Sequence, residues 1–466
     1  MIVMKFGGTS VEDAQAIRRL ANIVRGRLRQ QSVVVSSAMA GVTDTLLQTA
    51  STAAGGNEPA TLKLLEGLES RHITTAHQLL RDFNQTEADI SGLFAELRPL
   101  VSAICALREV TPQLSDRVAS FGECLSTVLV SAALRESGID ASLIDARECI
   151  VTDDHFTGAA PLMDASNERL RTRLMPLLEE KRVPVLAGFI AATAQGETTT
   201  LGRGGSDLTA ALVGGALDAE RVEIWTDVDG IRSTDPRLYR HTRHIESISF
   251  QEAAELAQLG AKVLHPATLI PAMEKNIPVY VLNSRNSLHP GTCVRSESFG
   301  PAGVKAIAVK HGITLVQAST ARSFRPTGLA SEMFSLLETN GYFPDIASIG
   351  HTSVTVTVDK KEAVACLREQ FEKRVNIKAE NSKALISLVA EDIHRIVGLP
   401  AQVFLALDGI EIWLASSSAS RRSLSLVTSE KDVPEVVRRL HESILQDNYR
   451  LLRVGAEESV ASAVSA

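Results

Sequence analysis

Up to about residue 290, short apolar runs rich in β-branched residues alternate with stretches of helical periodicity. This alternation predicts strands at 33–37, 184–191, 221–225 and 278–282, and helices at 11–30, 60–82, 116–136, 206–217 and 250–260. Several strands are continuously apolar, as expected when helices cover both faces of a parallel sheet. The pattern therefore indicates an α/β domain with an open, largely parallel sheet sandwiched by helices. The segment 51–110 is helical in pattern throughout, which is typical of an inserted subdomain or lid.

Beyond this region, residues 313–358 and 383–428 repeat each other at an offset of 70 residues. The shared anchors are Leu315 with Leu385, "TGL" with "VGL", Phe334 with Phe404, and Leu337 with Leu407. A repeat of this length indicates two βαββαβ-like α+β modules, with chance similarity of amphipathic segments as the alternative. We therefore expect a catalytic domain and two smaller modules, followed by a flexible tail, over residues 1–295, 304–382, 383–453 and 454–466.

The composition is that of a globular protein, with 44% apolar and 22% charged residues. A net charge of −7 and a pI near 5.9 argue against a broad nucleic-acid or membrane-surface binder. No uninterrupted apolar run of 18 residues occurs, so we expect no transmembrane helix. Five scattered cysteines without a CxxC or Cys/His cluster predict neither disulfides nor a metal site in the protein itself. Together with the lack of a secretory signal, they favour a cytoplasmic location.

The stretch "LGRGGSDLTAALVGGAL" (201–217) places a glycine-rich turn directly before an apolar helix. Its glycines let the backbone approach a bulky ligand or adopt positive φ, and Ser206 or Asp207 is suited to cap the helix. A helix N-terminus beside Arg203 favours an anion. The alternative is a tight strand-to-helix connection with nothing bound. The GxGxxG fingerprint is missed, because Asp207 stands at its third glycine.

Two other strands end in polar residues. "MKFGGTS" places Lys5 before Gly7 and Gly8, and a cation beside a glycine turn suits phosphate, although the chain has no Walker A sequence. "VVVSSAMAGVTD" ends a buried strand in Ser37 and Thr43, at the edge where ligands of open α/β sheets bind. A surface lysine and helix-capping hydroxyls are the alternative interpretations.

A further strand, "RVEIWT", runs into a loop that carries Thr226, Asp227 and Arg237, which suits Mg²⁺, ribose or a catalytic lysine, or only a solvated turn. Lys262 in "LGAKVLHP" adds a cation that would neutralise charge during transfer. Glu123 lies in an apolar helical stretch, so it either pairs with a cation or faces a cavity. Together these residues predict phosphoryl transfer, whose catalysis rests on positioning and electrostatics.

The chain resembles the aspartate kinases of the amino-acid kinase superfamily in five stretches, which occur in family order: "KFGGTS", "SSAMAGVTD", "TTTLGRGGSDLTA", "WTDVDGI…TDPR" and "GAKVLHP". The C-terminal duplication resembles that family's tandem ACT domains, so the resemblance covers nearly the whole chain. It implies transfer of the γ-phosphoryl group of ATP to the side-chain carboxylate of L-aspartate, the first step toward lysine, threonine, methionine and diaminopimelate. It also implies Mg²⁺ held mainly through the phosphates, and a homodimer or larger homo-oligomer.

The resemblance also assigns roles to individual residues. The catalytic set is Lys5, Asp207 and Lys262. The ATP-binding set is Lys5, Gly7, Gly8, Ser37, Thr226, Asp227, Arg232, Arg237, Lys262 and Val263. The aspartate-binding set is Thr43, Glu123, Arg203 and Ser206, with Glu123 on the α-ammonium and Arg203 on the α-carboxylate. The effector set is Ser323, Gly328, Leu329, Asp345, Gly350 and His351.

Two positions depart from the family pattern. Arg232 stands where relatives often carry an aromatic or apolar residue near the adenine. Gly350 and His351 replace the Ser-Glu pair that ends the effector loop of lysine-inhibited members, whereas Asp345 matches. A histidine does not neutralise an ammonium as a glutamate does, so we expect a lysine or threonine effector, or a dimer interface, rather than simple lysine inhibition.

Two other functions fit parts of the sequence. A kinase acting on another carboxylate, such as an acylated glutamate, shares the phosphate-binding parts, but Arg203 with Glu123 suits a free α-amino acid. An amino-acid sensor with an inactive kinase domain shares the duplicated modules, but it predicts the loss of a lysine or aspartate that this chain retains.

Overall fold

The computed structural model describes residues 1–260, 266–297, 303–319, 326–371, 374–418 and 420–446. Two compact units are formed, and the boundary between them is not a single point in the sequence. One comprises Met1–Ile231, Glu246–Phe250 and Val263–Phe299, and the other comprises Arg232–Ile245, Gln251–Lys262 and Gly300–Ala466. Two segments of residues 1–295 belong to the second unit in this division, and the expected domain bounds stay a prediction. The tail expected at 454–466 lies outside the described residues.

The first unit is built on a largely parallel sheet in the strand order β3-β5-β2-β1-β8-β10-β11-β9. Its strands are β1 (Ile2–Phe6), β2 (Ser32–Ser36), β3 (Ala141–Ile144), β5 (Val183–Ala187), β8 (Arg221–Thr226), β9 (Ser247–Ser249), β10 (Val279–Asn283) and β11 (Thr292–Arg295). Only the pair β10–β11 is antiparallel among the described strands of this sheet. A small second sheet contains β4 (Val151–Thr152), β6 (Ile190–Thr193) and β7 (Thr198–Thr200).

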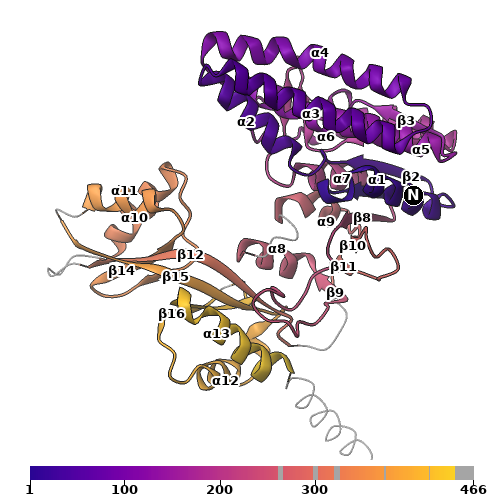
Figure 1. The fold of residues 1–466 in the computed structure, drawn as a ribbon. Helices are drawn as coiled ribbons and strands as arrows, with labels where there is room; N and C mark the ends of the chain where they lie inside the picture. Colours follow the sequence, from indigo (N-terminus) through magenta and orange to yellow (C-terminus); the bar gives the residue numbers. More distant parts are fainter. Residues whose placement is uncertain (261–265, 298–302, 320–325, 372–373, 419, 447–466) are drawn as a thin grey trace, which may run out of the picture. The chain divides into compact units, whose positions relative to one another are not determined.

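The helices of this unit are α1 (Ala14–Arg27), α2 (Val42–Ala54), α3 (Glu58–Leu79), α4 (Asn84–Leu107), α5 (Pro112–Glu136), α6 (Met163–Glu179), α7 (Gly205–Ala216) and α9 (Ile270–Glu274). Helices α2 to α5 pack side by side (Figure 1), and the segment 51–110 is helical as expected. Asp13 caps α1 by accepting the N–H of Ala16 at 2.7 Å. Thr111 caps α5 by accepting the N–H of Leu114 at 3.2 Å.

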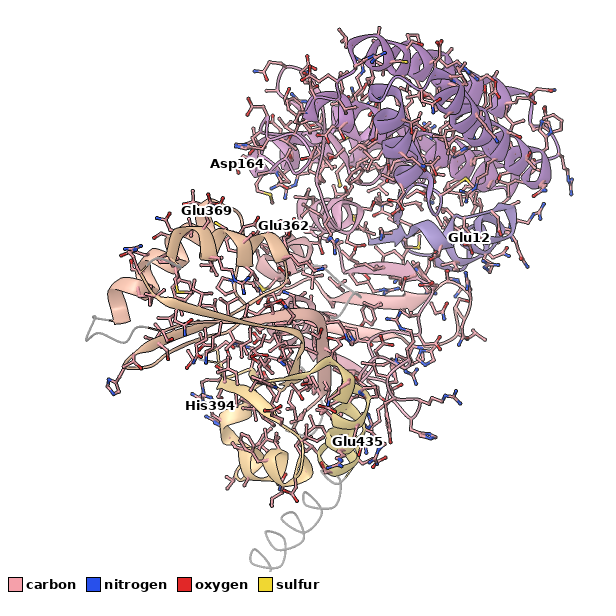
Figure 2. All side chains as sticks on the ribbon, turned by 60° about the vertical axis from the view of Figure 1, so that its left-hand side comes forward. Glu12, Asp164, Glu362, Glu369, His394 and Glu435 are labelled. Atoms are coloured by element: carbon pink, nitrogen blue, oxygen red, sulfur yellow. The ribbon has the colours of Figure 1, made fainter. Side chains whose placement is uncertain are left out.

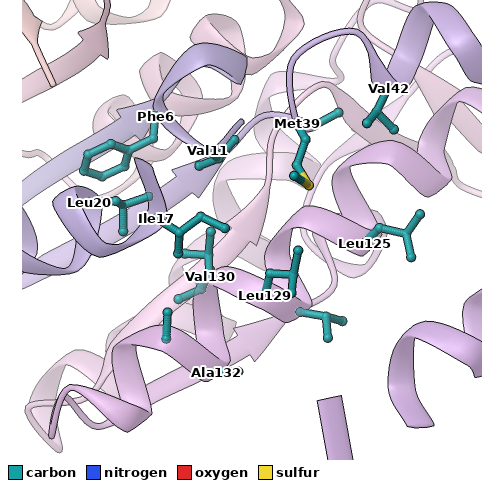
Figure 3. Packing of buried hydrophobic residues seen from close by; sticks show 14 of the residues in the cluster. Phe6, Val11, Ile17, Leu20, Met39, Val42, Leu125, Leu129, Val130 and Ala132 are labelled. Carbon is teal, nitrogen blue, oxygen red and sulfur yellow. The ribbon is translucent and has the colours of Figure 1, made fainter. Parts of the chain in front are cut away.

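The core of the unit joins the first strand to the helices on one side of the sheet. Phe6 on β1, Ile17 on α1 and Leu129 on α5 belong to one buried cluster (Figure 3). Met39 and Val42, from the loop after β2 and the start of α2, belong to the same cluster. The loops that follow β1 and β2 are therefore anchored by buried side chains.

Two helices, α4 and α5, are long and apolar enough to cross a membrane by length and composition alone. In α5, 83% of the apolar window is buried inside the protein. In α4 the buried residues recur on one face, at Ile90, Phe94, Leu97, Val101 and Ile104, and join the core cluster. The pattern of α5 is that of a core helix, whereas α4, with 28% of its apolar stretch buried, packs against the protein through one face.

The second unit contains a six-stranded antiparallel sheet in the order β13-β14-β12-β15-β17-β16. Its elements are β12 (Ala306–Ser319), α10 (Pro326–Thr339), β13 (Ala347–Ile349), β14 (Ser353–Val358), α11 (Lys361–Phe371), β15 (Asn376–Val389), α12 (Leu399–Ala406), β16 (Ile412–Ser417), β17 (Ser423–Ser429) and α13 (Val433–Leu440). Helix α8 (Phe250–Gln258) lies largely in this unit. On α11, Ala363, Leu367 and Phe371 are buried, whereas Glu362 and Glu369 are exposed (Figure 2).

The element order β-α-β-β-α occurs twice, as the 70-residue repeat predicts. The two long strands β12 and β15 are shared between the copies. The first part of β12, from Ala306 to Lys310, pairs with Val389 to Leu385, whereas its second part pairs with the start of β15. The predicted fold class is confirmed, with the addition that each module completes its sheet with half of a strand from the other.

One strand prediction is wrong. The apolar run 184–191 is not a single strand, because the chain turns at Gly188 and Phe189 between β5 and β6. Phe189 has a φ of 67°, a left-handed conformation that an apolar run does not signal. The turn places Phe189 beside the site described next.

Candidate active site

Loops that follow β1, β2 and β5 meet in one pocket of about 380 Å³. These strands are neighbours in the sheet and run parallel, so their carboxyl ends lie at the same edge, where α/β proteins bind ligands. The first turns of α2 and α7, and the middle of α5, complete the walls. The lining residues are Lys5, Gly8, Ser37, Ala38, Met39, Ala40, Gly41, Thr43, Asp44, Glu123, Phe189, Gly202, Gly204, Gly205, Ser206 and Asp207.

Lys5 and Asp207 form an ion pair in this pocket, with 2.6 Å between Nζ and Oδ1. Their side chains are only 12% and 14% exposed, so the pair is partly shielded from water. Lys5 extends from β1, and Asp207 lies in the first turn of α7. The carboxylate therefore holds the lysine ammonium in place within the pocket.

Glu123 is a buried carboxyl group in the pocket wall, with 3% of the residue exposed. Its Oε1 accepts the N–H of Ala38 at 3.2 Å. Its Oε2 is buried and has no hydrogen-bond partner among the described residues. Burial raises the pKa of Glu123 to about 8, although the Ala38 N–H and the charge of Lys5 act in the opposite direction. An unpartnered carboxylate oxygen in a pocket is suited to an incoming cation.

The turn before α7 adopts a conformation that requires its glycines. Gly202 and Gly204 have φ values of 69° and 74°, and Gly204 rather than Ser206 or Asp207 occupies the cap position. Arg203, between these glycines, is exposed, and no hydrogen bond or ion pair engages its guanidinium among the described residues. The turn thus presents a free guanidinium next to the pocket.

Close packing of Gly188 against Ser206 supports this turn. A Cβ atom on Gly188 would lie 2.6 Å from Cβ of Ser206. Gly188→Ala is therefore expected to lower the free energy of unfolding by about 1–3 kcal/mol, measured by urea denaturation. Gly67→Ala in α3, where an added Cβ meets nothing within 4 Å, is the control and is expected to be neutral or stabilising. Equal stabilities for Gly188→Ala and the wild type would show that the first turn of α7 shifts freely.

Sequence reasoning missed Phe189 in the pocket lining and Arg71, which supports the lining from outside. Phe189 was hidden in an apolar run, and its signal was only the preceding Gly188. Arg71 on α3 donates to the carbonyl of Ala40 at 2.9 Å and to that of Glu12 at 3.0 Å. It thereby fastens the loops after β1 and β2 to the helical subdomain, and no local motif marks it.

The residues predicted to bind the nucleotide are not all in the pocket. Gly8 and Ser37 line it, whereas the N–H of Gly7 donates to the carbonyl of Trp225 at 3.0 Å. The role of Gly7 in binding phosphate therefore stays a prediction. Thr226 and Asp227 lie at the carboxyl end of β8, next to β1. The hydroxyl of Thr226 donates a hydrogen bond to Oδ1 of Asp227 at 3.2 Å.

Two predicted nucleotide contacts belong to the second unit. Arg232 donates to Oγ1 of Thr242 at 2.6 Å, and Arg237 is exposed and pairs with Asp235 at 2.6 Å. Their roles remain predictions. Lys262 and Val263 lie outside the described residues.

The residues predicted to bind an effector are dispersed over the first ACT-like module. Asp345 lines a cavity of about 700 Å³ within the second unit, and both its oxygens accept from Nζ of Lys310, at 2.8 and 2.9 Å. Gly328 is exposed and Leu329 buried on α10. Gly350 and His351 are exposed between β13 and β14. Ser323 lies outside the described residues.

The chain matches the amino acid kinase family over residues 1–283, and an ACT domain over residues 386–444. The family match includes the whole pocket and more than half of the sequence. The chain therefore belongs to the amino acid kinase family.

Its similarity to characterised proteins is more specific. It is 35% identical over 456 residues to lysine-sensitive aspartokinase 3 of Escherichia coli, covering 96% of this chain and 99% of that protein. It is 32% identical to the chloroplastic aspartokinase 2 of Arabidopsis thaliana, over 95% of this chain and 84% of that one. Within the family the chain is an aspartokinase, that is, an aspartate kinase with an allosteric ACT region.

Two solved structures of the Escherichia coli aspartokinase III resemble this one. The R-state complex with aspartate and ADP has a TM-score of 0.83 at 34% identity, covering 96% of this chain and 100% of that one. The T-state complex with lysine and aspartate has a TM-score of 0.81 at 34% identity, covering 95% and 99%.

Proposed function

We propose that this aspartate kinase transfers the γ-phosphoryl group of ATP to the side-chain carboxylate of L-aspartate in the pocket around Lys5 and Asp207, forming 4-phospho-L-aspartate. The observation that carries the proposal is the buried, unpartnered Oε2 of Glu123 in the same pocket as the Lys5–Asp207 pair. The pocket thus holds a carboxyl group for the ammonium of an amino acid, and a cation for phosphate.

Aspartate would be held at both of its α-substituents. Its ammonium would bind Glu123, and its α-carboxylate would bind the guanidinium of Arg203, a bidentate interaction that suits arginine. Thr43 and Ser206, from the first turns of α2 and α7, line the space between them. The side-chain carboxylate would then point toward Lys5.

In the reaction, an oxygen of the side-chain carboxylate forms a bond to the γ-phosphorus, and the bond from that phosphorus to the β,γ-bridging oxygen breaks. ADP leaves, and its new negative charge stays on the β-phosphate. The attacking carboxylate is already ionised at neutral pH, so no general base is needed. Lys5, oriented by Asp207, would stabilise the charge on the transferring group.

ATP and Mg²⁺ belong to this proposal. Among the described residues no group of three or more His, Cys, Asp and Glu side chains is arranged to hold a metal ion. As the family resemblance implies, a divalent ion would be carried mainly by the phosphates, whose charge it neutralises when bound. Gly8, Ser37 and the residues after β8 would contact the nucleotide. We also propose a cytoplasmic location for the enzyme.

Trapping the acyl phosphate as its hydroxamate tests the reaction. We expect product from ATP with L-aspartate, but not with L-glutamate or N-acetyl-L-glutamate. Arg203→Ala should raise KM for aspartate about 10- to 100-fold, because a charge-assisted contact is lost, and leave KM for ATP unchanged. Arg173→Ala, which removes an exposed pair with Glu148, is the control. Product from N-acetyl-L-glutamate alone would assign the chain to a different carboxylate.

Regulation and assembly are the less specific part of the proposal. We expect a lysine or threonine effector at the ACT region and a homodimer or larger homo-oligomer. Repeating the assay with each amino acid, and measuring mass by light scattering, tests both. Because Asp345 is already paired with Lys310 and His351 replaces a glutamate, inhibition by lysine alone is not expected.

A further inference from the structure

We propose that Asp116 is a positioning residue for aspartate binding, which it serves by fixing the turn that carries Arg203. The inference rests on the proposed function, because it concerns how the pocket grips the α-carboxylate of its substrate. Asp116 does not line the pocket, and it belongs to none of the motifs that mark the family in this sequence.

The contacts of Asp116 are directed at two loop segments. It lies in the first part of α5 and is 2% exposed. Its Oδ2 accepts the N–H groups of Thr157 and Thr200, at 2.8 and 3.0 Å. Its Oδ1 accepts the hydroxyl of Thr200 at 2.7 Å. No cation pairs with it among the described residues, so three hydrogen bonds from the loops compensate its burial.

These two segments form the support of the Arg203 turn. Thr200 ends β7, directly before Leu201 and Gly202. The carbonyl of Thr200 accepts the N–H of Ala159 at 2.9 Å, which joins the two segments. A Cβ on Gly202 would lie 3.3 Å from Cα of Gly158, so the turn rests on the loop that Thr157 begins. Thr157 has a φ of 72°, a strained conformation that the bond to Asp116 helps to hold.

Helix α5 therefore carries a residue for each of the two α-substituents of aspartate, the ammonium and the carboxylate. Asp116 and Glu123 are seven residues apart, which places them on one face of the helix about 10 Å apart along its axis. Glu123 faces the pocket directly, whereas Asp116 acts through the loop that holds Arg203. One rigid helix thus sets the separation between the ammonium-binding and carboxylate-binding groups, which selects for a free α-amino acid.

A double-mutant cycle on the full-length enzyme tests the proposal. Asp116→Asn keeps the shape of the side chain but replaces an acceptor with a donor. We expect it to raise KM for aspartate about tenfold while KM for ATP changes less than twofold. When Arg203 is already alanine, Asp116→Asn should add less than a twofold further effect. Ser120→Ala, one turn along α5, is the control and should leave both KM values unchanged. Among the described residues, the hydroxyl of Ser120 bonds only to the carbonyl of Arg117 in its own helix.

Multiplicative effects of the two substitutions, or equal rises in both KM values, would overturn the proposal and leave Asp116 with a structural role alone. If Asp116→Asn does not fold, Thr200→Val provides the same test, because it removes only the hydroxyl donor. Inactivity of the wild type toward aspartate would instead contradict the proposed function. The two failures are thus distinguishable.

Discussion

Replacing Lys5 with methionine is expected to lower kcat about 10²–10³-fold, the loss typical of removing one preorganised group that stabilises charge in a transition state. The side chain of methionine retains the apolar stem but not the ammonium that pairs with Asp207 at 2.6 Å. Because Lys5 lies in a shielded pocket, water does not replace its charge effectively. Hydroxamate formation at saturating ATP and aspartate measures the change.

The structure offers a matched control for this variant. Lys275 also forms a Lys–Asp pair, with Asp218 at 3.1 Å, but both side chains are at least half exposed and neither lines the pocket. Lys275→Met should leave kcat within twofold, since exposed ion pairs contribute little. If Lys5→Met raised KM for ATP but left kcat unchanged, Lys5 would bind the ground-state nucleotide without stabilising the transferring group.

The periodic part of the sequence was sufficient to predict the fold. Continuous apolar runs correctly predicted β2, β8 and β10. Strands covered on both faces of a sheet have no polar side, so their apolar residues stand out as runs in the sequence. The run 184–191 was not one strand, because Gly188 and Phe189 form a turn made of a glycine and an apolar residue, so no polar residue marks it. The repeat revealed two modules, but it carried no information on which halves of β12 and β15 pair.

The candidate site was predictable where chemistry is local to a strand end or a helix start. Lys5, Asp207 and Glu123 were each identified from a charged residue next to glycines or inside an apolar stretch, and the structure brings all three to one pocket. Contacts such as those of Asp116 and Arg71 were not predictable, because an ordinary helical carboxylate or guanidinium gains its partners only when distant loops fold against it.

Glu123→Gln is expected to lower kcat/KM for aspartate about 10²–10³-fold at pH 9, and to remove its pH dependence. In the free protein, burial raises the pKa of Glu123 from 4.5 to about 8, so below pH 8 the carboxyl group is largely protonated. An aspartate ammonium must then displace that proton. For the wild type, kcat/KM for aspartate should therefore rise about tenfold per pH unit up to pH 8 and then level off, while KM for ATP follows no such trend. A flat profile between pH 6 and 8 would show that Glu123 does not bind the ammonium.

The titration of Glu123 also affects stability: the free energy of unfolding should fall as the pH rises, whereas kcat/KM for aspartate rises. A carboxyl group with a raised pKa in the folded state holds its proton more tightly than in the unfolded chain. Its contribution to stability is therefore present below pH 4.5 and is lost as the pH rises toward 8.

Glutamine has no proton to lose, so Glu123→Gln should melt at a higher temperature than the wild type at pH 9, with the difference narrowing toward pH 5. Saturating aspartate should stabilise the wild type and not the variant, because the ligand supplies the cation that the buried carboxylate lacks. A wild type that melts above the variant at pH 9 without ligand would contradict the assignment of Glu123 as an unpaired buried acid.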